Sequence, residues 1–332
     1  MSYPTVPWRS CADWKQMLHG FWPGKPKYTE SLYPELKDKV VIVTGGNTGV
    51  GYETVKSLAG STKARLYIFS RNKEKTLEAI KKIQLEIAKE YNVTNREIKF
   101  MQIDLSDLTS IKPAVEEFLK LENRLDIIIH NAGVMTPPVG SETKQGYELQ
   151  WGTNVLGPHL LQRLLDPLFI KTSETNPAGL SRIVWVASTA HMACPQGGIF
   201  WENIKFDNLK FSKNLQVTLY GQSKAGNIIQ ARTWSRKHGN PNVISSSICP
   251  GYLDTELQRH LNPVERAVLS WLLSPRRYGA YTELYAALSP DVKDGTHAIS
   301  FGNPAHIRED LKSDAIGDRL WAYLDKETEP YM

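Results

Sequence analysis

Tyr220 and Lys224 stand four residues apart in the pentapeptide Tyr-Gly-Gln-Ser-Lys, at the front of an apolar-periodic helix that we expect to run to about Lys237. Residues four apart lie on one face of a helix, so the phenol and the ammonium group can share one small site. A free phenol has a pKa of about 10, and a fixed cation nearby favours the phenolate and lowers that pKa. Tyr220 is therefore a candidate general acid/base. An ordinary half-exposed helix pair would show the same spacing.

A glycine-rich turn stands between the first predicted strand, residues 39–44, and the first predicted helix, residues 50–59. Its glycines are spaced G-x-x-x-G-x-G, which differs from the common G-x-G-x-x-G fingerprint but meets a similar demand. Glycine lets the backbone turn tightly and approach a pyrophosphate over the helix N-terminus, where free N–H groups favour anions. The residues expected to bind the phosphates are Gly45, Asn47, Thr48, Gly49, Val50 and Gly51.

The second strand, expected at residues 65–70, ends in Ser-Arg-Asn-Lys, at the point where dinucleotide-binding chains meet the adenosine ribose. An acid there would bind the 2′-hydroxyl of NAD, whereas Arg71, next to Ser70, can pair with the 2′-phosphate of NADP through its planar fork. This pattern favours NADP (NADPH) over NAD. The alternative is that Arg71 is a solvated surface arginine, since Thr48 supplies no second cation in the glycine turn.

Strand and helix patterns alternate along the chain from Lys39 onwards. Further strands are predicted at residues 98–103, 125–129, 183–187 and 243–248, and a strand at 298–302 with a helix at about 312–326 closes the chain. This alternation predicts an α/β fold: a Rossmann-type doubly wound parallel β-sheet with helices on both faces. No break in composition follows Lys39, so residues 39–332 are expected to form a single domain.

Composition excludes several classes of protein. The 332 residues include 40 basic and 35 acidic ones, and a net charge of +5 is too small and too scattered for a nucleic-acid surface. Three distant cysteines indicate neither a disulfide framework nor a metal site. No signal peptide is evident, and no stretch approaches the roughly 18 apolar residues of a membrane span. We therefore expect a cytoplasmic protein that has no transmembrane segment and binds neither metal nor nucleic acid.

Residues 1–38 form an N-terminal extension that is rich in Trp, Tyr and Pro and lacks strand patterning. Its Ser10 and Gly20 are placed to cap and to stop a short helix. The apolar residues at helical spacing are Trp14, Met17, Leu18 and Phe21. We expect this apolar face to pack on the main domain. The alternatives are a lid over an apolar substrate and a peripheral contact with a membrane surface.

The chain resembles the simple branch of the short-chain dehydrogenase/reductase family over roughly residues 39–302, and looks closest to its retinol-dehydrogenase-like members, including fungal ones. The motifs that carry the resemblance, beside the glycine turn and Tyr-x-x-x-Lys, are Asn131-Ala132-Gly133, Asn154, Ser188, Pro250-Gly251 and Thr255. One departure is His130, where many members carry a second Asn, and it is expected to affect the packing of the cofactor more than the chemistry.

The resemblance implies a cofactor site. Asp104 and Leu105 would face the adenine and Asn131 would lie near the ribose, beside Ala132 and Gly133. Thr255, which follows Pro250 and Gly251, would hold the nicotinamide carboxamide, while Tyr220 and Lys224 would also contact the cofactor.

The resemblance also implies an NADP-dependent oxidoreductase that interconverts a carbonyl and an alcohol. Hydride transfer to a carbonyl leaves an alkoxide that must be protonated and held. Tyr220 would donate the proton, and Ser188 would position the oxygen. Lys224 would lower the pKa of Tyr220, and Asn154 would hold a water that links Lys224 to solvent. Taken singly, Ser188 could be a strand-end turn former and Asn154 a helix kink. A catalytically silent cofactor-sensing or interaction protein is the alternative function, but it would be expected to lack part of this set.

The substrate is expected to be a bulky hydrophobic carbonyl or alcohol, as in members that act on retinoids, steroids or secondary metabolites resembling polyketides. Residues 252–278 resemble the substrate lid of the family, and Asn262-Pro263-Val264-Glu265 begins a predicted amphipathic helix there. The loop of residues 189–214 would form a second wall, in which His191 either contacts substrate or is a plain loop histidine. Family members are commonly homodimers or tetramers, although the added segments here could cover the usual interface.

Overall fold

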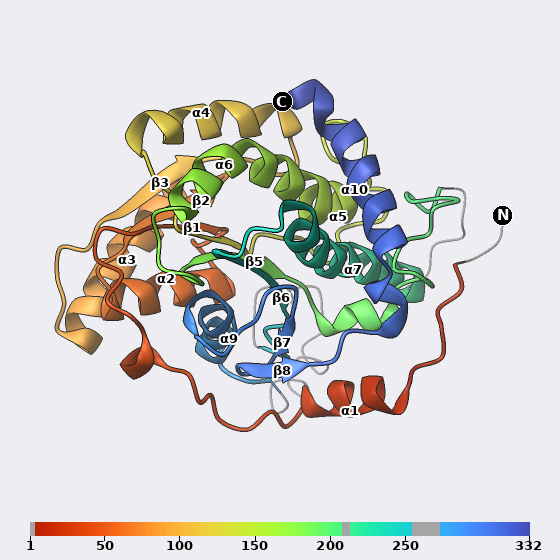
Figure 1. The fold of residues 1–332 in the computed structure, drawn as a ribbon, viewed down its shortest axis with the longest axis horizontal. Coiled ribbons are helices and arrows are strands. Elements are labelled where there is room, and N and C mark those ends of the chain that lie inside the picture. Colours follow the sequence, from red (N-terminus) through yellow and green to blue (C-terminus); the bar gives the residue numbers. More distant parts are fainter. Residues whose placement is uncertain (1–3, 208–212, 254–272) are drawn as a thin grey trace.

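The computed structural model describes residues 4–207, 213–253 and 273–332. In this part of the chain, eight strands form one sheet in the order β3-β2-β1-β4-β5-β6-β7-β8 (Figure 1). The strands are β1 (Val40–Thr44), β2 (Arg65–Ser70), β3 (Ile98–Gln102), β4 (Ile127–His130), β5 (Ser181–Val186), β6 (Val243–Ile248), β7 (His297–Ile299) and β8 (Asn303–Ala305). All neighbours pair in parallel except β7 and β8. The predicted doubly wound α/β fold is confirmed.

Helices cover both faces of the sheet. On one face lie α2 (Gly49–Ser61), α3 (Lys73–Tyr91) and α9 (Arg276–Leu288), and on the other α4 (Ile111–Leu121), α6 (Gly157–Ser173) and α7 (Lys213–His238). The closing helix α10 (Asp314–Thr328) packs against α7 (Figure 1). Shorter turns are η1 (Glu30–Leu32), η2 (Leu108–Ser110), α5 (Leu149–Trp151), η3 (Gly152–Leu156), η4 (Thr189–Ala193), η6 (Glu309–Lys312) and η7 (Glu329–Tyr331).

The central strands are apolar runs because both of their faces are covered. All five residues of β1 and all six of β5 are buried. After β3 the chain passes to the other side of β1 and enters β4. The carboxyl ends of β1 and β4 therefore border the point at which the strand order reverses, and open α/β sheets bind ligands there. The predicted phosphate turn lies at that point.

Two element boundaries differ from the prediction. Helix α7 begins at Lys213, so Tyr220 lies inside the helix and not at its front. Leu215 and Leu219, four residues apart and both buried, continue the helical face toward the N-terminus. The last predicted strand ends early, at Ile299, and Gly302, with φ +84°, lets the chain return as the antiparallel strand β8.

The N-terminal extension contains the predicted helix, α1 (Cys11–His19), with Ser10 as its N-cap and Gly20 as its C-cap. Its orientation differs from the expectation. Asp13 and Gln16 are buried, whereas Trp14 and Leu18 are exposed. Of the other two apolar residues, Met17 is half-buried and Phe21 stacks on Tyr252 of the main domain, with 4.7 Å between ring centroids. The segment thus packs through the polar side of α1 and through Phe21, and part of the predicted apolar face remains exposed.

The second half of the extension is tied to the domain by one carboxylate. Glu30 accepts hydrogen bonds from Ser57 Oγ at 3.0 Å, from Tyr91 OH at 3.0 Å and from Arg277 Nη2 at 2.8 Å. These partners lie on α2, α3 and α9. The extension is therefore anchored to the helical layer that covers one face of the sheet.

The described residues contain neither a membrane-spanning helix nor a metal-binding cluster. None of the helices there combines the length and the apolar character needed to cross a bilayer. Within the same ranges, His, Cys, Asp and Glu side chains do not gather in groups of three or more that could hold a metal ion.

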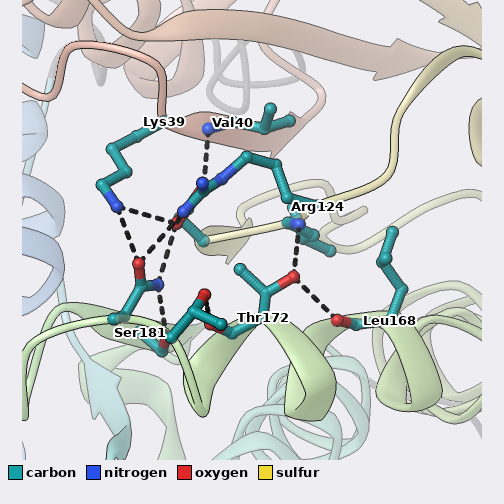
Figure 2. Close-up of polar contacts among 10 residues, drawn as sticks. Lys39, Val40, Arg124, Leu168, Thr172 and Ser181 are labelled. Carbon is teal, nitrogen blue, oxygen red and sulfur yellow. Dashed lines mark hydrogen bonds and ion pairs between the residues drawn. The ribbon is translucent and has the colours of Figure 1, made fainter.

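Asp126 joins three strands at the amino end of the sheet, opposite the predicted site (Figure 2). Its fully buried carboxylate accepts hydrogen bonds from Val40 N at 2.8 Å, from Asn176 Nδ2 at 2.8 Å and from Arg124 at 2.6 and 2.9 Å. Burial raises the pKa of Asp126, but the bonds from Arg124, Val40 and Asn176 outweigh burial, and the net pKa lies below its ordinary value. The charged form is therefore the one that stabilises the fold.

We predict that Asp126→Asn lowers the free energy of unfolding by about 3 kcal/mol at pH 7, because breaking a buried charged network leaves Arg124 without its partner. A carboxyl with a lowered folded-state pKa stabilises fully above its unfolded pKa of about 3.9 and loses this contribution as the pH falls through the folded value. The difference between the two proteins should thus shrink below about pH 4. Urea titrations across pH, with Glu117→Gln on the exposed side of α4 as a neutral control, test this. A difference that stays constant down to pH 3 would refute it.

Candidate functional site

Ser188 and Tyr220 meet at the carboxyl end of β5. Ser188 follows that strand in an extended conformation and caps the turn η4, with Ala190 N donating to its Oγ at 3.2 Å. The Ser188 hydroxyl lies close enough to the Tyr220 phenol to lower its pKa, and Tyr220 is buried on α7. The structure therefore brings together the predicted proton donor and the predicted oxygen-positioning hydroxyl. Ser188 also forms the strand-end turn that was its alternative interpretation.

Gly221 allows this meeting. A Cβ at Gly221 would lie far inside van der Waals contact of the carbonyl oxygen of Ala190 and 3.1 Å from the backbone nitrogen of Cys194. Helix α7 thus packs directly on the backbone of η4, one residue beyond Tyr220. No side chain larger than hydrogen fits at this contact without moving the helix away from Ser188.

Lys224 lies behind the Tyr220 ring, one turn further along α7. Its Nζ is 5.7 Å from the centre of that ring and donates a hydrogen bond to the Val186 carbonyl at 2.8 Å. Asn227 Nδ2 donates to the same carbonyl at 2.9 Å. Burial lowers the pKa of Lys224 to about 8. The predicted sharing of one site by the two side chains is confirmed.

The structure contradicts the expected direction of the Tyr220 pKa shift. Burial raises the pKa of Tyr220 above its ordinary value, and the nearby Ser188 hydroxyl offsets only part of this. Lys224 does not reverse the shift because it is itself buried and directs its ammonium at a backbone carbonyl. The helical spacing placed the two groups correctly, but it could not show how completely the protein removes water from both.

Asn154 lies in the π-helical turn η3, so its alternative interpretation as a helix kink also holds. Its Oδ1 accepts from Val134 N at 2.8 Å, and its Nδ2 donates to Val134 O at 2.9 Å and to Ser223 Oγ at 3.0 Å. A Cβ at Gly133 would be 3.0 Å from Asn154 Oδ1 and 3.4 Å from Lys224 Nζ. Asn154 and Lys224 therefore flank the chain as it leaves β4, and π turns of this kind occur frequently at functional sites.

The glycine turn is held to β4 by Asn131. Asn131 Nδ2 donates to Thr44 O at 2.8 Å, and Thr44 Oγ1 accepts from Ala132 N at 2.9 Å. A Cβ at Gly51 would overlap Asn131 Nδ2, and Gly45 adopts φ +66°. These glycines are needed because the chain after β4 packs on the turn.

The turn fits an anionic ligand. Thr48 is the N-cap of α2, and its side chain makes no capping bond. Gly49, at φ +60°, would carry a Cβ with nothing within 4 Å, so the space in front of the helix is open. Asn47 and Val50 border this space and are half-buried. Backbone N–H groups at a helix start lack intrahelical partners and attract phosphate.

The predicted adenosine side lies at the ends of β2 and β3. Ser70 is buried and its Oγ is 2.5 Å from Thr76 Oγ1, whereas Arg71 is exposed. Within the described ranges, no ion pair of the Arg71 guanidinium is recorded. Asp104 is half-buried and accepts from Ser106 N at 2.9 Å, and the buried Leu105 follows it. Arg71 and Asp104 therefore belong to neighbouring strand ends.

The predicted nicotinamide end is described only in part. Pro250 and Gly251 follow β6, and Gly251 adopts φ +102°, with a virtual Cβ 2.8 Å from Ser300 Cβ. Thr255 lies outside the described residues, as do residues 254–272 of the predicted lid, which include the predicted helix that begins at Asn262.

That residues 189–214 form a wall of the substrate pocket stays a prediction, and two aromatic side chains of this loop, Phe200 and Trp201, are half-buried. His191, Met192 and Phe206 are buried. His191 Nδ1 is 2.6 Å from Ser188 O, and burial lowers the His191 pKa to about 4. His191 is thus a loop histidine that supports the backbone of Ser188. His130 likewise stacks on Trp185 in the core.

Sequence reasoning missed two residues beside the Ser188 turn. Cys249 Sγ is 3.0 Å from Thr189 N and Oγ1, beside the Ser188 turn, and its place directly before Pro-Gly at a strand end could have indicated this. Arg308, far away in sequence, donates to the carbonyls of His191, Met192 and Cys194 at 3.3 Å and to Pro195 O at 2.8 Å. No local pattern in the sequence indicates Arg308.

We predict that Gly221→Ala destabilises the protein by about 1–3 kcal/mol, because a methyl group forced against backbone atoms overpacks the site. Gly226→Ala on the same helix is the matched control. The atoms nearest to a Cβ at Gly226 would be side-chain atoms, the Val155 methyl groups at 3.2 and 3.3 Å and a Trp151 ring carbon at 3.7 Å, and the methyl groups can shift. Chemical denaturation should therefore show a clearly larger loss for Gly221→Ala, and equal losses would contradict the assigned contact.

Known proteins share both the sequence and the fold. A family model described as short chain dehydrogenase matches residues 39–200. A short-chain dehydrogenase/reductase of Armillaria gallica is 38% identical over 318 residues, covering 95% of this chain and 98% of that protein. A crystal structure of an uncharacterized protein from Mycobacterium paratuberculosis covers 91% of this chain and 97% of its own, with TM-score 0.68 and 24% identity.

A second solved structure, an NADPH-bound carbonyl reductase from chicken fatty liver, covers 82% of this chain and 100% of its own, with TM-score 0.58 and 18% identity. At these identities the two structures show the fold alone. The relative from Armillaria gallica extends over almost the whole chain and carries the family assignment. The chain therefore belongs to the short-chain dehydrogenase/reductase family of oxidoreductases, whose members bind a nicotinamide cofactor.

Proposed function

We propose that this protein is an NADP(H)-dependent oxidoreductase that interconverts a carbonyl and an alcohol on a bulky hydrophobic small molecule, with Tyr220 as general acid/base. The observation that carries the proposal is the proximity of the Ser188 hydroxyl to the Tyr220 phenol, with Lys224 buried 5.7 Å from the centre of the Tyr220 ring. A protein that only sensed the cofactor would have no use for a proton donor held at this point.

The cofactor, when bound, supplies or accepts the hydride. Ser188 and Tyr220 direct two hydroxyl groups from different elements at one point, so together they can hold a substrate oxygen and exchange its proton. In the reductive direction Tyr220 gives its proton to the new alkoxide. In the oxidative direction it takes the proton from the alcohol.

Lys224 makes the loss of the Tyr220 proton feasible. Burial raises the pKa of Tyr220, so a phenolate formed there needs a positive neighbour. The ammonium group of Lys224 can be that neighbour. It lies on the same face of α7 as Tyr220, 5.7 Å from the centre of the Tyr220 ring. We propose that Lys224 stabilises the phenolate during turnover and also holds the ribose hydroxyls. Asn154, next to Lys224 across Gly133, would join it to solvent through a water.

The cofactor preference rests on the end of β2. Ser70 pairs with Gln102 across β2 and β3, and Arg71 follows Ser70 as an exposed residue. No carboxylate stands at these positions, so nothing there would repel a 2′-phosphate, and the Arg71 fork can bind it bidentately. The solved carbonyl reductase with the same fold is itself an NADPH complex, which agrees with this choice.

The substrate class rests on the sequence of the predicted lid. A recess beside the start of α7 has an apolar part formed by Pro137, Val139 and Leu219, and polar side chains such as Glu148 and Lys205 also line it. The apolar part suits a hydrophobic group of a substrate that also carries polar atoms. A panel of large aldehydes, ketones and quinones is therefore the appropriate set of test compounds.

We predict that Tyr220→Phe lowers the turnover number by about 10²- to 10⁴-fold, the usual contribution of general acid–base catalysis, and leaves NADPH affinity nearly unchanged. NADPH oxidation against the panel measures turnover, and quenching of protein fluorescence measures binding. Tyr28→Phe, which removes a phenol oxygen from the N-terminal extension, is the control. Full turnover by Tyr220→Phe would rule out the proposed mechanism, and NADPH binding without turnover by the wild type on any substrate would favour the silent cofactor-binding alternative.

We predict that Arg71→Ala weakens NADPH binding by about 10- to 100-fold, as expected for the loss of a hydrogen-bonded charge pair, and hardly changes NADH binding. Lys89→Ala, at the far end of α3, removes the same charge from an exposed position and should affect neither cofactor. Titration of both cofactors against all three proteins decides the point. Equal losses for NADPH and NADH in Arg71→Ala would show that Arg71 does not read the 2′-phosphate.

A further inference from the structure

A row of large apolar side chains points away from the protein in the first part of the N-terminal extension. Trp8 is 100% exposed, Trp22 73%, Leu18 55% and Trp14 49%. We call these four residues the aromatic face. Three exposed tryptophans so close together are unusual, because aromatic side chains are normally found in cores or at interfaces.

The polar side of α1 holds the aromatic face in this orientation. His19 Nε2 is 2.8 Å from the carbonyl oxygen of Ser300, and the buried Asp13 lies 3.7 Å from His306. Asp13 also accepts from Ser10 N at 2.8 Å as part of a capping box. Turning the apolar side inward would break these contacts, so the outward orientation of the tryptophans is built into the structure.

The charges around the aromatic face are almost all positive. Residues 4–27 contain four basic side chains, and their one acid is the buried Asp13. The basic residues are Arg9, Lys15, Lys25 and Lys27. Arg9 lies over the Trp14 ring at 5.4 Å, and Lys15, Lys25 and Lys27 are exposed. Glu309, an exposed acid that interacts electrostatically with Asp13, is paired with Lys312.

From this geometry we infer that the aromatic face docks on the surface of an anionic membrane. Tryptophan prefers the boundary between headgroups and acyl chains, and lysine and arginine next to it bind acidic headgroups. A second copy of the chain would bring the same positive charges against one another, so self-association through this face is disfavoured.

Docking would also orient the catalytic end of the sheet. Helix α1 is fixed to Ser300, which follows β7, and Gly20 packs on Tyr252, which follows β6. The Ser188 turn likewise follows β5, so all three lie at carboxyl ends of parallel strands. If the proposed function holds, a hydrophobic substrate could reach the site from the lipid. The membrane contact itself does not depend on that function.

The test is flotation of the full chain with phosphatidylcholine vesicles, with and without phosphatidylserine. The wild type should float with vesicles that contain phosphatidylserine. The vesicle-bound fraction of the variant W8S/W14S/L18S/W22S should be at least about tenfold lower than that of the wild type. The matched control is L85S/L121S, which removes exposed leucines from α3 and α4 and should float like the wild type. Equal thermal midpoints and NADPH binding show that each variant is folded.

Further arms separate the sources of binding. K15E/K25E should abolish the preference for phosphatidylserine and leave the fold unchanged, because these side chains are exposed. Tyr220→Phe should float like the wild type, so a failure of the proposed mechanism and a failure of the membrane contact remain distinguishable. The inference is overturned if the wild type stays in solution with both vesicles or if the fourfold variant floats equally well. It is also overturned if the wild type dimerises in lipid-free solution and the variant W8S/W14S/L18S/W22S does not, because the aromatic face would then be a dimer interface.

Discussion

The close packing of α7 on the turn after β5 is the contact on which the site depends. At Gly221 the helix rests on backbone atoms, so the position of Tyr220 relative to Ser188 is set by the main chain and not by flexible side chains. The same packing buries Lys224, whose ammonium group then has a carbonyl oxygen as its partner in place of a carboxylate. A carbonyl satisfies the hydrogen bond but does not neutralise the charge. The cation therefore remains able to act on Tyr220.

Buried amides at the strand ends complete this arrangement. Asn131 bonds the carbonyl oxygen of Thr44, and Asn154 bonds both polar groups of Val134. Strand ends leave backbone groups without ladder partners, and buried groups of this kind must find other ones. An Asn side chain has both a donor and an acceptor, so it can satisfy such groups while keeping two chains at a fixed separation. The chain segments that follow β1 and β4 are held in place in this way.

Local spacing in the sequence predicted the features that depend on neighbouring residues. The glycine turn, the shared face of Tyr220 and Lys224 and the caps of α1 lie where the pattern placed them, because each depends on a few consecutive φ/ψ angles or on one helical turn. Features that depend on distant residues were not predictable. Arg308 reaches the Ser188 turn from over a hundred residues away, and the pKa of Tyr220 rises because of burial by the whole fold. Cofactor contacts and the lid stay predictions.

Helix α1 shows why an amphipathic pattern alone cannot orient a helix. The periodicity of Trp14 and Leu18 marks an apolar side, and burial of such a side against the core is the usual outcome. Here Asp13 and His19 make specific polar contacts with the domain, and Trp14 and Leu18 remain exposed to water. Keeping apolar surface exposed forgoes about 25 cal/mol for each Å² that burial would gain. That gain is recovered only when another apolar phase covers the side, and the positive charge of the segment selects an acidic surface as that phase.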